Sequence, residues 1–255
     1  AASRKAHASY ARNSTRVLPA VSSSIPEAVG ALRRGEVVAV ATDTIYGLAA
    51  HCESKEGVEK LYRIKGRPLD KPLAISVGSV EDVALYGNVS SLPCGLLQEL
   101  LPGAVTVCLR KREDLTVARI RPEVVSPLET IAIRVPGAAF IRDLCSSLGS
   151  AVALTSANPS GSPSCLRIEE FSSLWPQLAV VLEKHDSSSD DASHTTEERC
   201  EETSSSRSGS TIVDLSVDGT YAILRDGDQQ VLQEIRQVLE RFGLDESQAP
   251  LGAKK

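Results

Sequence analysis

Short, continuously apolar segments alternate along this chain with segments in which apolar residues recur at helical spacing. Residues 37–41 are apolar at every position, which is typical of a strand covered on both faces of a sheet. Ser54 is a suitable N-cap for a helix whose apolar residues from Val58 to Ile64 share one face. The two patterns together predict a layer of strands packed against helices.

Other segments repeat these patterns. Further strands are predicted at 71–77, 104–109, 130–135, 151–155, 211–215 and 221–225. Further helices are predicted at 26–34, 93–101, 138–147, 168–175 and 229–242. This alternation, without an internal repeat, indicates one α/β domain with a single twisted, mostly mixed sheet and flanking helices.

We place this domain at 23–243, between a leader and a tail. Residues 1–22 contain four basic residues and no acidic one, and they are rich in Ala and Ser. That composition resembles an organelle transit peptide, although a disordered leader without a targeting role would have the same composition. Residues 244–255 form the predicted tail.

An acidic segment interrupts the domain at 185–209, between two predicted strands. It holds eight serines, and Ala192 is its only aliphatic residue, so we predict a disordered surface insertion. Its seven acidic and two basic residues account for the whole net charge of −5. With the basic leader also set aside, the body carries about −4, which argues against a broad nucleic-acid surface.

Several familiar motifs are absent from the sequence. There is no Walker phosphate loop, no G-x-G-x-x-G after the first strand, and no run of 18 apolar residues that would predict a membrane span. The six cysteines form no C-x-x-C pair, and Leu97 stands where a zinc deaminase signature starting at His51 would need its second cysteine. We therefore expect no protein-bound metal, and catalysis that depends on positioning and electrostatics.

Polar residues gather directly after the buried strands, where an α/β sheet binds its ligands. Residues 42–48 follow the first apolar strand, and 155–161 follow a later one. Five cations belong to this set: Lys65, Arg67, Lys71, Arg134 and Arg225. Together they would suit a highly anionic ligand, such as a triphosphate with carboxylates.

Taken singly, most of these signals have an ordinary explanation. Lys65 and Arg67 could be the solvated C-terminus of a helix, 156–159 could be a simple turn, and Thr211 could merely begin a strand. Arg134 is different, because it lies in an apolar strand and a guanidinium there requires a partner or a cavity.

Taken together and in order, the motifs resemble the YrdC family of threonylcarbamoyl-AMP synthases, with the eukaryotic mitochondrial and cytosolic members most similar. The resemblance spans about 24–228. It rests on Thr42-Asp-Thr-Ile-Tyr-Gly-Leu, Lys65-x-Arg67, Lys71-Pro-Leu, Pro102-Gly, Arg134-x-Pro136, Ser156-x-Asn158 and Ser210-Thr-x-x-Asp214. One departure is the acidic insertion, which stands where the family usually has a Gly-Gly-rich segment.

The resemblance implies a twisted α/β fold around a positively charged cavity. It also implies a nucleotidyltransferase that makes threonylcarbamoyl-AMP and pyrophosphate from L-threonine, bicarbonate and ATP, the first step towards the t6A base at position 37 of tRNA. Matching positions assign threonine to Thr42, Arg134 and Thr211. They assign ATP to Lys65, Arg67, Thr130, Ser156, Asn158, Ser164 and Arg225, of which Lys65, Arg67, Ser156 and Asn158 would be catalytic.

The same resemblance implies further expectations. ATP would be a substrate, and Mg²⁺ would be held by its phosphate oxygens. The product would pass to a downstream threonylcarbamoyl transferase complex, without stable tRNA binding by this chain. We expect the protein in the cytoplasm and the mitochondrion. A second hypothesis is an RNA-binding module that uses the same basic cavity, and a related carbamoyl-transfer enzyme for another amino acid also stays open.

Overall fold

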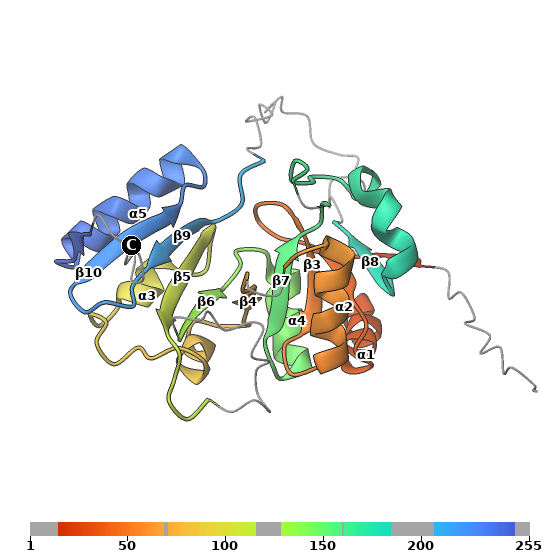
Figure 1. The fold of residues 1–255 in the computed structure, drawn as a ribbon, viewed down its shortest axis with the longest axis horizontal. Helices are drawn as coiled ribbons and strands as arrows, with labels where there is room; N and C mark the ends of the chain where they lie inside the picture. Colours follow the sequence, from red (N-terminus) through yellow and green to blue (C-terminus); the bar gives the residue numbers. More distant parts are fainter. Residues whose placement is uncertain (1–14, 69–70, 116–128, 160, 185–206, 248–255) are drawn as a thin grey trace, which may run out of the picture.

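The computed structural model describes residues 15–68, 71–115, 129–159, 161–184 and 207–247. These residues form one mixed sheet of eleven strands, in the order β1-β8-β2-β3-β7-β4-β6-β5-β9-β10-β11. Figure 1 shows the sheet twisting from β8, β3 and β7 through β4 and β6 to β5, β9 and β10. The predicted fold class, a single mixed sheet with flanking helices, is confirmed.

The strands are short. Their bounds are β1 Arg16–Pro19, β2 Val38–Ala41, β3 Tyr46–His51, β4 Ala74–Ser76, β5 Val105–Arg110, β6 Thr130–Arg134, β7 Val152–Ser156, β8 Val180–Glu183, β9 Thr211–Asp214, β10 Thr220–Arg225 and β11 Asp245–Glu246. Pairing is antiparallel for β2–β3, β3–β7, β4–β7, β5–β6 and β9–β10, and parallel elsewhere.

Helices flank the sheet at both ends. The α-helices are α1 Ile25–Arg33, α2 Lys55–Lys65, α3 Leu96–Leu100, α4 Ala139–Leu148 and α5 Gln229–Arg241, and the 3-10 helices are η1 Ser22–Ser24, η2 Glu81–Leu85 and η4 Ile168–Gln177. In Figure 1, α1, α2 and α4 lie beside β3 and β7, whereas α3 and α5 flank β5, β9 and β10. No helix among the described residues is long and apolar enough to cross a membrane.

The apolar strand β2 separates two buried clusters. Val38 and Val40 pack into a cluster with residues of α1 and α4, whereas Val37 and Ala39 belong to a larger cluster that includes residues of α2 and η4. Side chains alternate between the faces of a strand, so a strand covered on both sides must be apolar at every position. The pattern at 37–41 is thereby explained.

The α2 helix follows its sequence signals closely. The Ser54 hydroxyl accepts a hydrogen bond from the Gly57 N–H at 3.1 Å, so Ser54 is the N-cap as predicted. Gly66 ends the helix in the left-handed conformation at φ 58°, which glycine adopts without strain. The helix therefore stops where Lys65, its last residue, can reach Ser156 at the end of β7.

The structure corrects three boundaries. The predicted leader at 1–22 extends too far, because β1 pairs in parallel with β8 and η1 immediately precedes α1. The predicted tail at 244–255 begins too early, because β11 pairs with β10. The predicted insertion at 185–209 ends too late, because Arg207 and Gly209 have defined contacts. Within these three segments, residues 1–14, 185–206 and 248–255 lie outside the described residues.

Two further differences concern β3 and η4. The strand β3 was not predicted, because residues 42–48 read as a polar loop, whereas only 42–45 turn and Tyr46 begins an antiparallel strand. The segment predicted as a helix at 168–175 is 3-10 in character and continues to Gln177. Of these two elements, only β3 lines the cavity described below, through Tyr46 and Gly47.

Candidate active site

A cavity of about 350 Å³ opens where the central strands meet the turn after β2 and the start of β9. Eight Ser and Thr residues line it: Thr42, Thr44, Ser76, Thr106, Thr155, Ser156, Ser164 and Ser210. Three guanidinium groups line it as well, those of Arg67, Arg134 and Arg225, and no described lining residue is acidic. Such a lining suits an anionic, oxygen-rich ligand.

The turn after β2 is held by the hydroxyl of Thr42. This oxygen accepts from the N–H groups of Thr44 and Ile45, at 3.2 Å each, and its proton is donated to the Ile45 carbonyl at 2.7 Å. Thr44 Oγ1 lies 3.0 Å from Thr42 Oγ1 and accepts from Arg134 Nη1, so Thr44 donates its own proton to Thr42. Thr42 therefore fixes the turn and presents little unused hydrogen-bonding capacity.

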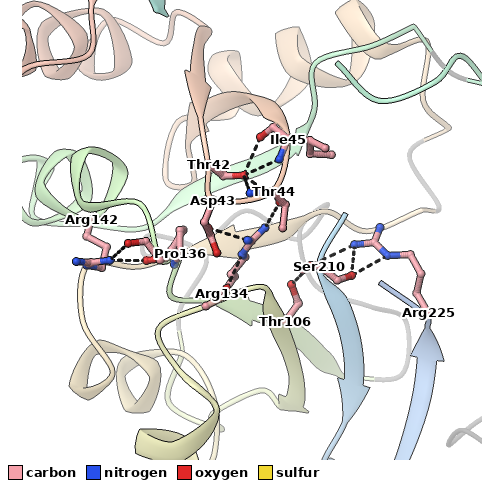
Figure 2. Close-up of polar contacts among 12 residues, drawn as sticks. Thr42, Asp43, Thr44, Ile45, Thr106, Arg134, Pro136, Arg142, Ser210 and Arg225 are labelled. Atoms are coloured by element: carbon pink, nitrogen blue, oxygen red, sulfur yellow. Dashed lines mark hydrogen bonds and ion pairs between the residues drawn. The ribbon is translucent and has the colours of Figure 1, made fainter. Parts of the chain in front are cut away.

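Arg134 lies at the end of β6 and reaches this turn from below (Figure 2). Nη2 donates to Asp43 Oδ1 at 2.8 Å, Nη1 to Thr44 Oγ1 at 3.0 Å, and Nε to the Gly103 carbonyl at 3.1 Å. Burial lowers the pKa of Arg134, while the Asp43 carboxylate raises it and sustains the charge. The sequence predicted that a guanidinium in this apolar strand needs a partner or a cavity. Arg134 has both, since Asp43 is its partner and its side chain lines the cavity.

The expected contact between Arg134 and a substrate carboxylate is consistent with this arrangement. A guanidinium has five N–H donors, and the three hydrogen bonds use one each from Nε, Nη1 and Nη2. One donor on each terminal nitrogen is left for a ligand in the cavity. Asp43 thus orients the guanidinium and does not exhaust it.

Lys65 is not a solvated helix end. It is 5% exposed, and its ammonium donates to the Ser156 carbonyl at 2.8 Å, to Ser156 Oγ at 3.3 Å, to Asn158 Oδ1 at 3.0 Å and to the Asn158 carbonyl. Burial, followed by the charge of Arg67, lowers the pKa of Lys65 to about 8. In this structure Lys65 shapes the turn after β7 and does not line the cavity.

The turn after β7 is also held by a hydrogen bond from the side chain of Asn158 to the backbone of Ser162. Asn158 is buried and donates through Nδ2 to the Ser162 carbonyl, while its Oδ1 accepts from Lys65. Ser156, at the start of this turn, lines the cavity. Asn158 therefore positions the turn, whereas Ser156 is placed to touch a ligand.

Arg225 closes the opposite side of the cavity, on β10 (Figure 2). Its Nε and Nη2 donate to the Ser210 carbonyl at 3.1 and 2.8 Å, and Nη2 also lies 3.2 Å from Ser210 Oγ. Ser210 Oγ in turn lies 2.7 Å from Thr106 Oγ1 on β5. Burial, followed by the charges of Arg134 and Arg67, lowers the pKa of Arg225, so an anion between the three arginines would be stabilising.

Thr211, which the resemblance assigns to threonine, is not among the described residues that line the cavity. Its side chain is fully buried, and its hydroxyl accepts from the Gly227 N–H at 3.2 Å. Gly227 must be glycine, because a Cβ there would lie 2.7 Å from both N and Oγ1 of Thr211. Alternation along β9 turns Ser210 and Ile212 towards the cavity and Thr211 away from it.

Of the other expected site residues, Arg67 and Ser164 line the cavity and Thr130 does not. Arg67 lines the cavity, with Nε 3.0 Å from the Lys71 carbonyl and Nη2 2.9 Å from the Pro72 carbonyl. Ser164 lines it too. Thr130, at the far end of β6, is opposite Arg110 in the sheet and is not among the lining residues.

Sequence reasoning missed Thr44, Ser76 and Ser210 as lining residues. Ser76 is fully buried, and its hydroxyl has no hydrogen-bond partner among the described residues. It is paired with Arg134 across β4 and β6, and both line the cavity. Alternation from Ala74 would have indicated its face, but not its neighbour, because β4 and β6 pair across more than fifty intervening residues.

Within the part of the chain that the structure describes, these groups have neither an activated thiol nor a metal centre beside them. The only thiol among the described lining residues is that of Cys108, and burial, followed by the charge of Asp214, raises its pKa to about 12. Within the described residues, no three His, Cys, Asp or Glu side chains are arranged to hold a metal ion. The cavity can therefore bind and orient charged groups, and its described residues offer no thiolate.

Comparison with models of known protein families shows which family the chain belongs to. The model Sua5_yciO_yrdC, described as "Telomere recombination", matches residues 30–197. The chain belongs to the Sua5/YciO/YrdC family. The resemblance found in the motifs is thereby confirmed, since the matched range includes the turn after β2, α2 and the turn after β7.

Curated relatives within this family carry a consistent name. The chain is 41% identical over 220 residues to the threonylcarbamoyl-AMP synthase of Bos taurus, which covers 85% of this chain and 72% of that protein. It is 43% identical over 200 residues to the threonylcarbamoyl-AMP synthase of Homo sapiens, covering 78% of this chain and 66% of that protein. The match therefore spans about two thirds to three quarters of these relatives' length.

Solved structures of the Sua5/YciO/YrdC family show the same fold. The crystal structure of P. abyssi Sua5 complexed with L-threonine matches with a TM-score of 0.71 and 24% identity, covering 93% of this chain and 63% of that one. E. coli YciO matches with a TM-score of 0.63 and 22% identity, covering 81% of this chain and 91% of that one. At these identities the likeness concerns the fold.

Proposed function

We propose that this chain is a threonylcarbamoyl-AMP synthase, which converts L-threonine, bicarbonate and ATP into threonylcarbamoyl-AMP, pyrophosphate and water. The observation that carries the proposal is the convergence of Arg67, Arg134 and Arg225 on one cavity with hydroxyl groups between them. The name shared by its mammalian relatives supports the same activity.

The chemistry fits a cavity without an activated nucleophile. The amine of threonine and bicarbonate give a carbamate, whose oxygen attacks the α-phosphorus of ATP and displaces pyrophosphate. Both reactants are anionic, so the protein must overcome their repulsion with preorganised cations and hydroxyls. Arg134 would bind the threonine carboxylate, while Arg67, Arg225, Ser156 and Ser164 would surround the triphosphate.

The remaining expected residues act through others in this proposal. Lys65 and Asn158 hold the turn that presents Ser156, and Thr42 holds the turn that presents Thr44. Ser210 takes the place at the cavity that the sequence assigned to Thr211. Mg²⁺ would enter with ATP and be held by phosphate oxygens and water.

In the cell, the product would serve the t6A modification of tRNA through a downstream threonylcarbamoyl transferase, without stable tRNA binding by this chain. We propose a location in both cytoplasm and mitochondrion, which fluorescence microscopy of the tagged full chain would test. A signal confined to one compartment would refute the dual location.

The decisive experiment is ATP–pyrophosphate exchange. Exchange of labelled pyrophosphate into ATP should require both threonine and bicarbonate, and Arg67→Ala should abolish most of it. Arg112→Ala is the control, because Arg112 is an exposed arginine that does not line the cavity. Serine and valine in place of threonine test whether the amino-acid substrate is threonine. Absence of exchange under all conditions, combined with salt-sensitive RNA binding, would favour an RNA-binding module instead.

A further inference from the structure

One arginine fastens the segment that leads into β9 to the opposite wall of the cavity. The Arg207 guanidinium forms a fork on the Glu170 carboxylate, with Nη1–Oε2 2.8 Å and Nη2–Oε1 2.9 Å. Nη1 also donates to the carbonyl of Ser164, a cavity-lining residue, at 2.6 Å. In Figure 1 the blue chain entering β9 rises towards the turquoise chain that precedes η4.

Glu170 is itself fixed to the backbone. Its Oε2 accepts from the Leu166 N–H at 3.0 Å, in the segment just before η4. Hydrogen bonds from Arg207, and then from Leu166, lower the pKa of Glu170 to about 2, so the carboxylate stays ionised at neutral pH. The fork therefore has a firm attachment on the side of η4.

Arg207 belongs to the segment that leads into β9, and this segment contacts Arg225 through Gly209 and Ser210. Arg207 lies two residues before Gly209, and a Cβ at Gly209 would come within 2.9 Å of Arg225 Nη2. The next residue, Ser210, accepts hydrogen bonds from Arg225 Nε and Nη2. The guanidinium of Arg225 thus rests directly on the segment that Arg207 holds in place.

Exposed ion pairs add little to the stability of a fold. The Arg207 and Glu170 side chains are 48% and 30% exposed, so the importance of the pair lies in what it orients. A planar fork on a carboxylate fixes direction as well as distance. That geometry is suited to aligning a short segment beside a binding cavity.

We propose that Arg207 and Glu170 form a positioning pair that orients Arg225, through Gly209 and Ser210, towards the phosphates of a nucleoside triphosphate. The inference rests on the proposed function, because it takes ATP as the ligand of Arg225. Arg207 touches no ligand in this arrangement and acts through the segment that it anchors.

The first test compares Arg207→Ala with wild type and with Arg112→Ala. Arg112 is a matched control: it forms a fork on Asp114, donates to the Ala84 carbonyl, is 40% exposed and does not line the cavity. Calorimetry with ATP alone should show affinity weakened about tenfold in Arg207→Ala, with the melting temperature within about 2 °C of wild type. Arg112→Ala should bind ATP as wild type does.

The second test asks whether Arg207 acts through Arg225. The double variant Arg207→Ala/Arg225→Ala should bind ATP no more weakly than Arg225→Ala, because the two residues then share one effect. Arg207→Lys keeps the charge without the fork and should recover only part of the affinity. Additive losses, or full recovery in Arg207→Lys, would overturn the proposal.

Binding of ATP separates this inference from the proposed function. If wild type binds ATP but makes no threonylcarbamoyl-AMP, the proposed function fails while the positioning pair is still decided by affinity. If wild type is active and Arg207→Ala binds ATP normally, or if Arg112→Ala weakens binding equally, the positioning pair is wrong. A wild-type protein that does not bind ATP would overturn both.

Discussion

Asp43 forms an ion pair with the buried cavity residue Arg134, with Asp43 Oδ1 2.8 Å from Arg134 Nη2. The carboxylate comes from the turn after β2 and the guanidinium from the end of β6, so the pair joins two strands that are not neighbours in the sheet. Gly137 packs closely against it, since a Cβ there would lie 3.0 Å from Asp43 Oδ2. The pair therefore sets the direction of the guanidinium before any ligand enters.

Replacing Asp43 should lower the stability of the protein and increase the stabilisation that added L-threonine provides. Asp43→Asn keeps a hydrogen-bond acceptor but leaves the buried guanidinium without a counter-charge, which should lower the free energy of unfolding by about 1–3 kcal/mol. Added L-threonine should raise the melting temperature of this variant more than that of wild type, because its carboxylate supplies the missing charge. Thermal unfolding with and without threonine measures both effects.

The control for this variant is Asp114→Asn, whose partner Arg112 is exposed at the surface. Its free energy of unfolding should change by less than about 1 kcal/mol, as is usual for exposed pairs. An equal threonine effect in Asp43→Asn and wild type would show that the carboxylate of threonine does not reach Arg134.

Arg134→Lys tests which substrate this cation holds. Lysine keeps the charge but loses the planar fork, so threonine binding should weaken by about 1–3 kcal/mol, whereas ATP binding alone should change little. Calorimetry of each ligand with the folded variant distinguishes the two. Loss of ATP binding with threonine binding retained would assign Arg134 to the triphosphate.

Ser76→Ala should separate stability from function. The Ser76 hydroxyl is buried without a partner among the described residues, so its removal should leave the free energy of unfolding unchanged or raise it by up to about 1 kcal/mol. If a bound substrate supplies the partner, the KM for that substrate should rise while the melting temperature does not fall. Unchanged kinetics together with reduced stability would mean that the hydroxyl is structural.

The pH dependence of ATP binding should reflect Lys65. Its pKa is lowered to about 8, chiefly by burial, so it is charged below that pH and loses its proton as the pH rises through it. The neutral amine retains fewer donors for Ser156 and Asn158, and it no longer offsets the charge of the triphosphate. Calorimetry between about pH 7 and 9.5 should therefore show ATP affinity falling as pH rises.

Lys65→Met supplies the comparison, because methionine fills similar space and does not titrate. This variant should bind ATP weakly at every pH, without the fall near pH 8. A fall of the same size in Lys65→Met would assign the titration to another group.

The periodicity of the sequence determined the α/β class, the cap at Ser54 and the apolar strand at 37–41, because local hydrogen bonding and alternating burial leave a direct pattern along the chain. The motifs also determined the family. They placed Arg67, Arg134, Ser156 and Arg225 at one cavity, since strand ends in an α/β sheet converge on a ligand site.

Only the tertiary structure decided which members of each motif reach the cavity. Thr211 and Ser210 are adjacent in sequence, but the pleat of β9 turns Ser210 inward and buries Thr211 against Gly227. Asp43 finds Arg134, and Arg207 finds Glu170, through pairings between distant segments. Ion pairs of this kind depend on how strands are ordered and twisted in space, which no local pattern of residues encodes.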